Sequence, residues 1–249
     1  MRQRLSRKSG HNSPMTKSLR ILALSDLHGK CFKEAASLID EQRPDWIVLC
    51  GDMLPDFDRI AGRESRLEAQ REFWKVYRSR FIRPFAVTTL VRGNHEIEGF
   101  ADPGLQQLPA MLQGRVVRLE GIPVEFGAWG WSREWEEEGL VSELQAQLAG
   151  NPVPSIYVSH VPPYGCLDRA WGGDNIGHRP LFQHLRRGDW PEALVLCGHV
   201  HESFGSMECG ETLVVNAACG YALLEWSLGT PRLVSQARLE PARESDWDF

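Results

Sequence analysis

Short motifs rich in histidine and carboxylate recur along this chain, and nearly every one directly follows a short apolar run. The motifs are, in order, Asp26-Leu27-His28, Gly51-Asp52, Gly93-Asn94-His95, His160 and Gly198-His199-Val200-His201. The apolar runs that precede them are Ile21–Leu24, Trp46–Cys50, Val87–Val91, Ile156–Val158 and Leu194–Cys197. An apolar or β-branched run followed by Gly or Asp is typical of a buried strand that ends in a loop. Because open α/β folds gather their ligand sites beyond such strand ends, the motifs are predicted to meet at one place.

The apolar pattern predicts alternating strands and helices up to about residue 200. The opening predicts a strand, a helix and a parallel strand joined by a right-handed crossover, over Leu19–Ser25, Phe32–Gln42 and Asp45–Cys50. Further strands are expected at Phe85–Val91, Val116–Leu119, Val124–Trp129, 155–159 and 193–197, and helices at Glu64–Arg80, Leu105–Leu112, Leu140–Leu148 and 179–187. From residue 203 onward, short strands separated by glycine predict an antiparallel meander. The whole pattern predicts an α/β fold with two sheets flanked by helices.

Composition bounds the class of protein. With 249 residues, 42% of them hydrophobic and 24% charged, the chain is expected to bury a full core. Residues 18–249 show no fixed-period repeat and no long linker, and are predicted to form a single domain. Residues 1–17 are basic and rich in Ser, Asn and Gly, which predicts a disordered leader. We expect no membrane partner, because no apolar stretch approaches the ~20 residues that cross a bilayer.

Charge and cysteine usage narrow the partners and the compartment. The first twenty residues carry +6 and the whole chain −5, which leaves −11 for the remainder. An acidic body disfavours a broad nucleic-acid groove, although metal ions would offset part of this charge. The six cysteines include no C-x-x-C pair, and Cys50 and Cys197 end predicted buried strands. This usage favours free thiols in a reducing, cytoplasmic environment.

The motif residues suit two divalent cations that lie close together. Imidazole and carboxylate ligands bind Mn, Fe, Zn and Ni, and no thiolate is present in the motifs. Residues two apart on an extended segment point the same way, so Asp26 with His28 can reach one site from a single strand end. The same holds for His199 with His201. The candidate metal ligands are Asp26, His28, Asp52, Asn94, His160, His199 and His201.

As an ordered set, the motifs resemble the calcineurin-like metallophosphoesterase superfamily, whose pattern is D-x-H, G-D, G-N-H-[ED], H and G-H-x-H. The resemblance covers residues 19–217 and includes every motif. It implies a four-layer αββα sandwich in which two mixed β-sheets are flanked by helices. It also implies a small phosphoester as the substrate.

The same resemblance implies a role for each motif residue. One metal ion would be held by Asp26, His28, Asp52 and His201. The other would be held by Asp52, Asn94, His160 and His199, so that Asp52 bridges the two ions and is part of the catalytic machinery. His95 is expected to be a catalytic histidine rather than a ligand. The ions are expected to be Mn²⁺, Fe²⁺/³⁺, Zn²⁺ or Ni²⁺, of which Mn²⁺ is favoured.

The segment from His160 to Asp168 is similar to the H-x-P-P-x-G-x-x-D loop of small cyclic-nucleotide-type phosphodiesterases and metallophosphoesterase-domain proteins. The implied activity is hydrolysis of a small, nucleotide-type phosphodiester by a hydroxide that bridges the ions, with His95 as general acid. One alternative is a phosphomonoesterase or protein phosphatase of the same fold. The other is a non-catalytic metal-binding scaffold, although such scaffolds typically lack a ligand and none is missing here.

Three further residues are candidates for contacts with the substrate. Arg92 precedes Gly93 and could bind a phosphate oxygen, although an arginine at a strand end is more often a surface charge. His178 either reaches the substrate or begins the helix that follows it. Trp131 either stacks on a ring at the rim of the site or packs beneath its loop. The pocket is expected to be shaped by loops 53–62, 99–104, 129–138 and 161–177.

Overall fold

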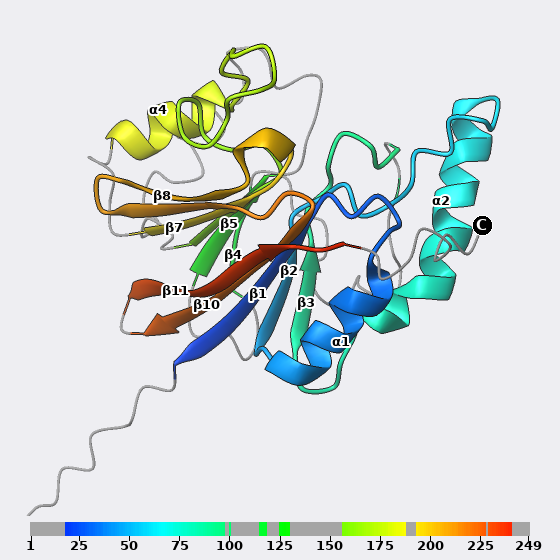
Figure 1. The fold of residues 1–249 in the computed structure, drawn as a ribbon, viewed down its shortest axis with the longest axis horizontal. Helices are drawn as coiled ribbons and strands as arrows, with labels where there is room; N and C mark the ends of the chain where they lie inside the picture. The colour runs from blue at the N-terminus through cyan, green and yellow to red at the C-terminus, as the bar shows by residue number, and fades with distance from the viewer. Residues whose placement is uncertain are drawn as a thin grey trace, which may run out of the picture.

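Two mixed β-sheets form the centre of the protein (Figure 1). The computed structural model describes residues 18–97, 100, 115–118, 125–129, 156–187, 193–227 and 229–240. The predicted leader, residues 1–17, lies outside the described residues, as do the helices predicted at Leu105–Leu112 and Leu140–Leu148. None of the helices in the described ranges is long and apolar enough to cross a bilayer.

The first sheet has the strand order β11-β10-β1-β2-β3. Its parallel part consists of β1 (Leu19–Ser25), β2 (Trp46–Leu49) and β3 (Val87–Leu90). The antiparallel part is the hairpin of β10 (Gly220–Ser227) and β11 (Thr230–Arg238), in which β10 pairs with β1. The predicted parallel pairing of the first two strands is confirmed.

The second sheet has the strand order β4-β5-β6-β7-β9-β8. Four neighbouring strands run parallel, and the two edge strands are antiparallel to their neighbours. The strands are β4 (Arg115–Arg118), β5 (Glu125–Trp129), β6 (Ile156–Ser159), β7 (Ala193–Cys197), β8 (Gly205–Cys209) and β9 (Thr212–Asn216).

Both faces of the central strands are buried, which explains their continuous apolar sequences. Alternate residues of β1 face opposite sides, because side chains alternate along a strand. Ile21 and Ala23 pack between the sheets, against residues of the second sheet such as Val158. Leu22 and Leu24 face the other way, toward helices. Full burial of Ile21, Leu22 and Leu24 contributes about 1.5–3 kcal/mol for each side chain.

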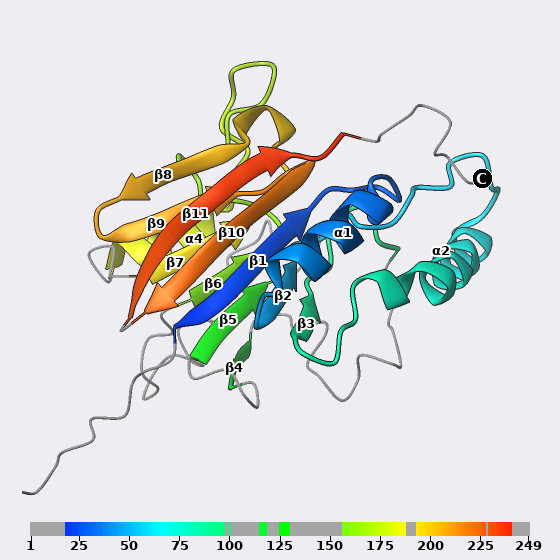
Figure 2. The same ribbon diagram turned by 60° about the horizontal axis from the view of Figure 1, so that its bottom comes forward.

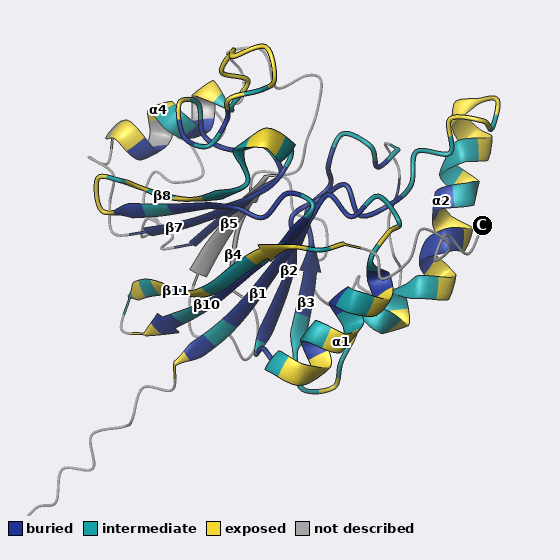
Figure 3. Cartoon of the chain, viewed as in Figure 1, coloured by how far each residue is buried: buried dark blue, intermediate teal, exposed yellow. Residues whose placement is uncertain are grey.

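Helices cover the outer face of each sheet, so the described part of the chain has four layers (Figures 1 and 2). On the first sheet lie α1 (Phe32–Gln42) and α2 (Arg63–Tyr77), the latter followed by a short 3₁₀ turn, η1 (Arg78–Arg80). On the second sheet lies α4 (Arg179–Arg187), whose Leu181 and Leu185 pack on the strands. The central strands are buried, whereas the edge strands β8 and β11 and the outer faces of the helices are partly exposed (Figure 3). The predicted sandwich of two mixed sheets with flanking helices is confirmed.

The prediction of one antiparallel meander after residue 203 is wrong. The segment forms two separate hairpins, and each one joins a different sheet. Strand β9 of the first hairpin pairs in parallel with β7, and β10 of the second pairs with β1. The glycine-separated pattern predicts the hairpins but not their partners, since both strands of each hairpin can bury an apolar face on either sheet.

Candidate metal centre

The predicted ligands lie on loops that follow the carboxyl ends of parallel strands. Asp26 directly follows β1, and His160 directly follows β6. Asp52, Asn94 and His199 lie within four residues of the ends of β2, β3 and β7. Because the strands of each parallel set end on the same edge, five loops from two sheets converge there (Figure 1).

The loops after β1 and β2 are joined to each other by backbone hydrogen bonds. The N–H groups of Asp26, His28 and Gly29 donate to the carbonyls of Gly51, Asp52 and Met53 at 3.0, 2.9 and 2.8 Å. These bonds hold non-glycine residues at positive φ, 56° at Asp26, 47° at His28 and 53° at Asp52. A residue in this region costs of order 1–3 kcal/mol and persists only where its surroundings enforce it. His199, with φ of 68°, is a fourth predicted ligand in this region.

Two glycines allow the motif loops to approach the carboxylates closely. A Cβ atom on Gly93 would lie 2.1 Å from Asp52 Oδ1, and one on Gly198 would lie 2.2 Å from Asp26 Oδ2. Any larger residue at either position would displace a predicted ligand. The motif glycines are therefore required by the packing of the site.

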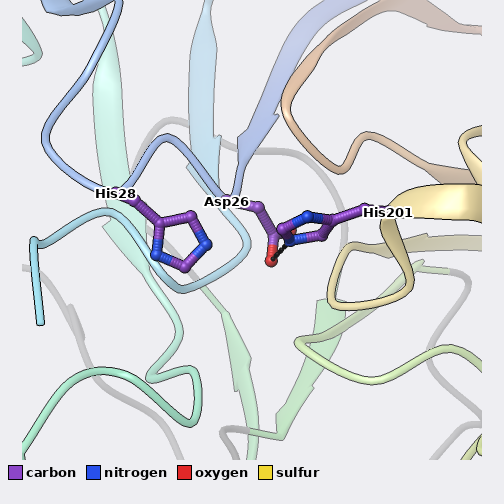
Figure 4. A group of neighbouring side chains, drawn as sticks. All are labelled: Asp26, His28 and His201. Atoms are coloured by element: carbon purple, nitrogen blue, oxygen red, sulfur yellow. Dashed lines mark hydrogen bonds and ion pairs between the residues drawn. The ribbon is translucent and has the colours of Figure 1, made fainter.

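The first group of potential ligands contains Asp26, His28 and His201, whose ligand atoms lie within 4.8 Å of one another. Figure 4 shows the Asp26 carboxylate between the two imidazole rings. Asp26 Oδ1 lies 3.2 Å from His201 Nε2, and Asp26 Oδ2 accepts a hydrogen bond from the His199 backbone N–H at 2.9 Å. The carboxylate is buried, whereas the His201 side chain is 42% exposed.

The second group contains Asp52, His160 and His199, again within 4.8 Å. His160 Nε2 lies 3.3 Å from Asp52 Oδ2 and 2.9 Å from Asn94 Oδ1. The other ring nitrogen, Nδ1, donates to the Cys50 carbonyl at 2.9 Å. A second partner of this kind fixes the tautomer of a ligating histidine and directs its free nitrogen toward the metal.

Asp52 connects the groups. It also forms a third potential ligand group with His28 and His95. Its Oδ1 accepts a hydrogen bond from the His95 backbone N–H at 2.8 Å, while Oδ2 faces the imidazoles of His160 and His95, the latter at 3.8 Å. All seven predicted ligands are therefore brought together, and Asp52 lies at their centre.

The carboxylates of the site stabilise the charged form of two of the imidazoles, those of His160 and His201. Burial lowers the pKa of His160, but the charges of Asp52 and Asp26 outweigh it and raise that pKa to about 9. The hydrogen bond to Asp26 raises the pKa of His201 to about 10. Burial lowers the pKa of His199 to about 4, so that its imidazole is neutral and able to coordinate. Carboxylate, amide and imidazole atoms that converge on a buried place fit two divalent cations.

Metal-free and metal-loaded protein are expected to respond oppositely to pH. The pKa values of His160 and His201 are raised from 6.5 to about 9 and about 10 on folding, so they stabilise the metal-free fold fully below pH 6.5. That contribution is lost as the pH rises through the folded pKa values. Metal ions compete with these protons and bind better at high pH. Thermal unfolding with a chelator and with Mn²⁺ at pH 6.5 and 9 checks this: the metal-free midpoint should fall and the Mn²⁺-induced rise should grow.

Sequence reasoning missed a carboxylate beside His95. Asp56 Oδ1 is hydrogen-bonded to His95 Nδ1, which leaves Nε2 directed toward Asp52. Asp56 lies four residues after Asp52, in the loop that was expected only to shape the pocket. Its spacing from the Gly51-Asp52 motif could have suggested it.

Glu96 is buried beneath the site and organises both loops around it. Its carboxylate oxygens accept backbone N–H groups of Asp52 at 2.9 Å, Met53 at 2.7 Å, Leu54 at 3.2 Å and Gly93 at 2.7 Å. Burial and the nearby Asp52 charge raise the pKa of Glu96 to about 7, while the N–H donors favour its charged form. The side chain thus ties the loop that contains Asp52 to the loop that contains His95.

The three predicted substrate contacts are not among the described ligand groups. Arg92 is buried directly before Gly93, rather than being an exposed charge. His178 lies at the base of the loop that follows His160, where its backbone N–H donates to the Pro162 carbonyl at 2.7 Å. Burial lowers the pKa of His178 to about 4. Trp131 lies outside the described residues. Substrate binding by all three stays a prediction.

Comparison with known proteins agrees with this geometry. The model of the calcineurin-like phosphoesterase family matches residues 19–203. The UPF0046 protein K07C11.7 of Caenorhabditis elegans is 28% identical over 235 residues, which cover 83% of this chain and 73% of that protein.

Two solved structures share the fold. The protein TT1561 of Thermus thermophilus has a TM-score of 0.56 at 18% identity, covering 90% of this chain and 100% of that one. A dimetal phosphatase from Danio rerio has a TM-score of 0.54 at 12% identity, covering 88% of this chain and 99% of that one. With the family model matched over most of the chain, every motif present and the ligand atoms converged, the chain belongs to the calcineurin-like phosphoesterase family.

Proposed function

We propose that this chain is a dinuclear metal-dependent phosphodiesterase that hydrolyses small, nucleotide-type phosphodiesters. The observation that carries the proposal is the convergence of three potential ligand groups on one place, two of which share Asp52. A single metal ion does not need three overlapping groups, whereas two ions a few ångströms apart need a shared carboxylate.

The proposed ligand sets follow the groups. Asp26, His28, Asp52 and His201 would hold one cation, and Asp52, Asn94, His160 and His199 the other. When bound, two such cations supply a nucleophile from water at neutral pH and neutralise the charge that develops on phosphoryl oxygens. We favour Mn²⁺ for its match to the carboxylate and amide oxygens, whereas the imidazoles also fit Fe, Zn and Ni.

His95 is proposed to deliver a proton to the leaving oxygen. Its Nδ1 is hydrogen-bonded to Asp56, and its Nε2 lies 3.8 Å from Asp52 Oδ2. The proton donor is the imidazolium form, in which Nδ1–H is donated to Asp56 and Nε2–H is presented to the leaving oxygen. Proton transfer from a positioned side chain contributes typically about 10²–10⁴-fold to the rate.

The charge of the site supports a diester. Asp26, Asp52 and Asp56 lie in the site and Glu96 lies beneath it, and together they offset the charge of two divalent cations. A site with little net positive charge favours a diester, which carries one negative charge, over a monoester dianion. The compact loop after His160 also supports a diester, since its sequence is similar to that of small phosphodiesterases.

A phosphomonoesterase is the second candidate, and Arg92 favours it. This guanidinium is buried directly before Gly93, within the loop that contains Asn94 and His95. An arginine that reached the phosphoryl group would stabilise the second charge of a monoester.

The test is hydrolysis of bis-p-nitrophenyl phosphate and p-nitrophenyl phosphate by Mn²⁺-loaded protein, with Asp52→Ala as the inactive control. The proposal expects the diester to be cleaved faster, in terms of kcat/KM, than the monoester. Faster cleavage of the monoester would contradict the phosphodiesterase proposal and support a phosphomonoesterase. Cleavage of neither compound, with two ions bound per chain, would indicate the non-catalytic scaffold.

Asp56→Asn is expected to lower kcat by about 10–100-fold while two metal ions remain bound. The amide keeps the size of the carboxylate but offers the His95 Nδ1–H a neutral acceptor in place of a charged one. The loss should be larger for an alkyl than for a p-nitrophenyl leaving group, because only the alkyl oxygen requires a proton. Metal analysis and steady-state kinetics on both esters check it, and equal losses on the two esters would contradict the role.

We also propose a cytoplasmic location without a membrane partner; nucleic acid is disfavoured as a partner by the acidic body. The six cysteines are free thiols, three of them buried, as is typical of a reducing compartment. Cell fractionation tests the location directly.

A further inference from the structure

A polar side chain is fully buried on the inner face of α2. Gln70 is 0% exposed and lies three residues before Phe73 and four before Trp74, which pack on the first sheet. Residues with this spacing share one face of a helix. A buried amide on such a face is costly unless its donors and its acceptor are all satisfied, so its contacts explain why it is tolerated.

The amide of Gln70 joins three backbone positions. Its Nε2 donates to the Pro55 carbonyl at 3.1 Å and to the His95 carbonyl at 2.8 Å. Its Oε1 accepts the Ile97 N–H at 2.8 Å. Two carbonyls face the nitrogen and one N–H faces the oxygen, so only one orientation of the amide satisfies all three.

These contacts reach both members of the His95–Asp56 pair. Pro55 immediately precedes Asp56, and the bond to the His95 carbonyl fixes the backbone of the histidine itself. Glu96 ties the same two loops together nearer the metal ligands, through Asp52 and Gly93. Gln70 ties them through other backbone groups, the carbonyls of Pro55 and His95 and the N–H of Ile97.

We propose that Gln70 is a positioning residue that sets the geometry of the His95–Asp56 pair. It contacts neither metal nor substrate and acts through the backbone of the two loops. A displacement of about 1 Å at a proton donor can lower a rate by about 10²-fold, so the consequence is large for a residue outside the reaction. The effect on catalysis rests on the proposed function, whereas the effect on the order of the two loops does not.

Two substitutions test the proposal. Gln70→Met keeps the volume and removes all three hydrogen bonds, and Gln70→Glu keeps the acceptor for Ile97 while removing both donors. Thr88→Val is the matched control: Thr88 is also buried, and its hydroxyl donates to the Phe81 carbonyl at 2.9 Å. Any one folded Gln70 variant is sufficient for the comparison.

The first measurement is hydrogen exchange by mass spectrometry on the full chain. Loss of the Gln70 bonds is expected to speed exchange by roughly tenfold in peptides that cover residues 53–58 and 94–97 together. Peptides from β1 and β2 should be unchanged, and Thr88→Val should leave both loops as in the wild type. Exchange in the loops that matches the wild type would overturn the proposal, whether or not the protein is an enzyme.

The second measurement tests the effect on catalysis separately from the effect on the two loops. With Mn²⁺ bound, the Gln70 variants are expected to lose about 10-fold or more in kcat on a diester with an alkyl leaving group and only a few-fold on bis-p-nitrophenyl phosphate. KM should change little. Equal losses on both esters would show a merely structural role and would overturn the positioning of His95. A wild-type protein inactive on both esters would instead remove the proposed function, and the exchange result would still decide whether Gln70 holds the loops.

Discussion

Asp52→Ala is expected to remove both metal ions and to lower phosphoester hydrolysis by at least about 10³-fold. Asp52 belongs to two of the three ligand groups, whereas Asp26 and His201 belong to one. Its Oδ2 is buried opposite the ring nitrogens of His160 and His95. Without this oxygen, the first set of ligands keeps a single carboxylate, that of Asp26, and the second set keeps none. Neither cation is then adequately neutralised.

The measurement is the metal content of dialysed protein by elemental analysis, together with the rate on bis-p-nitrophenyl phosphate. Asp168→Asn is a suitable control, because Asp168 is an equally buried aspartate outside the three groups. It accepts the backbone N–H groups of Gly165 and Gly177, both at 2.9 Å. The control should keep two ions per chain. Two ions bound to folded Asp52→Ala would contradict a shared ligand at this position.

Most of the layered core could be predicted from local sequence. The first strand and helix begin and end where expected, at Leu19–Ser25 and Phe32–Gln42. Their apolar runs are buried, so the sequence signal is strong and continuous. The second helix was expected to extend to Arg80, but the α-helix ends at Tyr77 and continues as a 3₁₀ turn.

The assembly of the ligands could be predicted for the same reason. Each motif closely follows a strand, and parallel strands end on one edge, so the order of motifs along the chain translates into proximity in space. What each strand pairs with could not be predicted: the partners of β9 and β10 are distant in sequence and compatible with the same apolar pattern.

The residues around His95 were missed because their roles depend on contacts between distant segments. Gln70 is 25 residues from His95 along the chain, and Asp56 is 39. In the sequence, Gln70 is one polar residue of an amphipathic helix, and nothing local separates it from its exposed neighbours. Only the packing of α2 against the two loops reveals that its amide is buried and that both its nitrogen and its oxygen are hydrogen-bonded.

His95→Asn is expected to leave both metal ions in place and to lower turnover by around 10²-fold or more on esters with alkyl leaving groups. An alkoxide is a poor leaving group unless it is protonated, whereas p-nitrophenolate departs without help, so the loss on bis-p-nitrophenyl phosphate should be much smaller. Asparagine cannot transfer a proton, and its backbone N–H still donates to Asp52 Oδ1, as that of His95 does at 2.8 Å. Steady-state kinetics over a series of leaving groups, with metal content as the control, check the role. An unchanged rate with the alkyl ester would contradict it, and loss of one metal ion would reassign His95 as a ligand, as its place beside His28 and Asp52 allows.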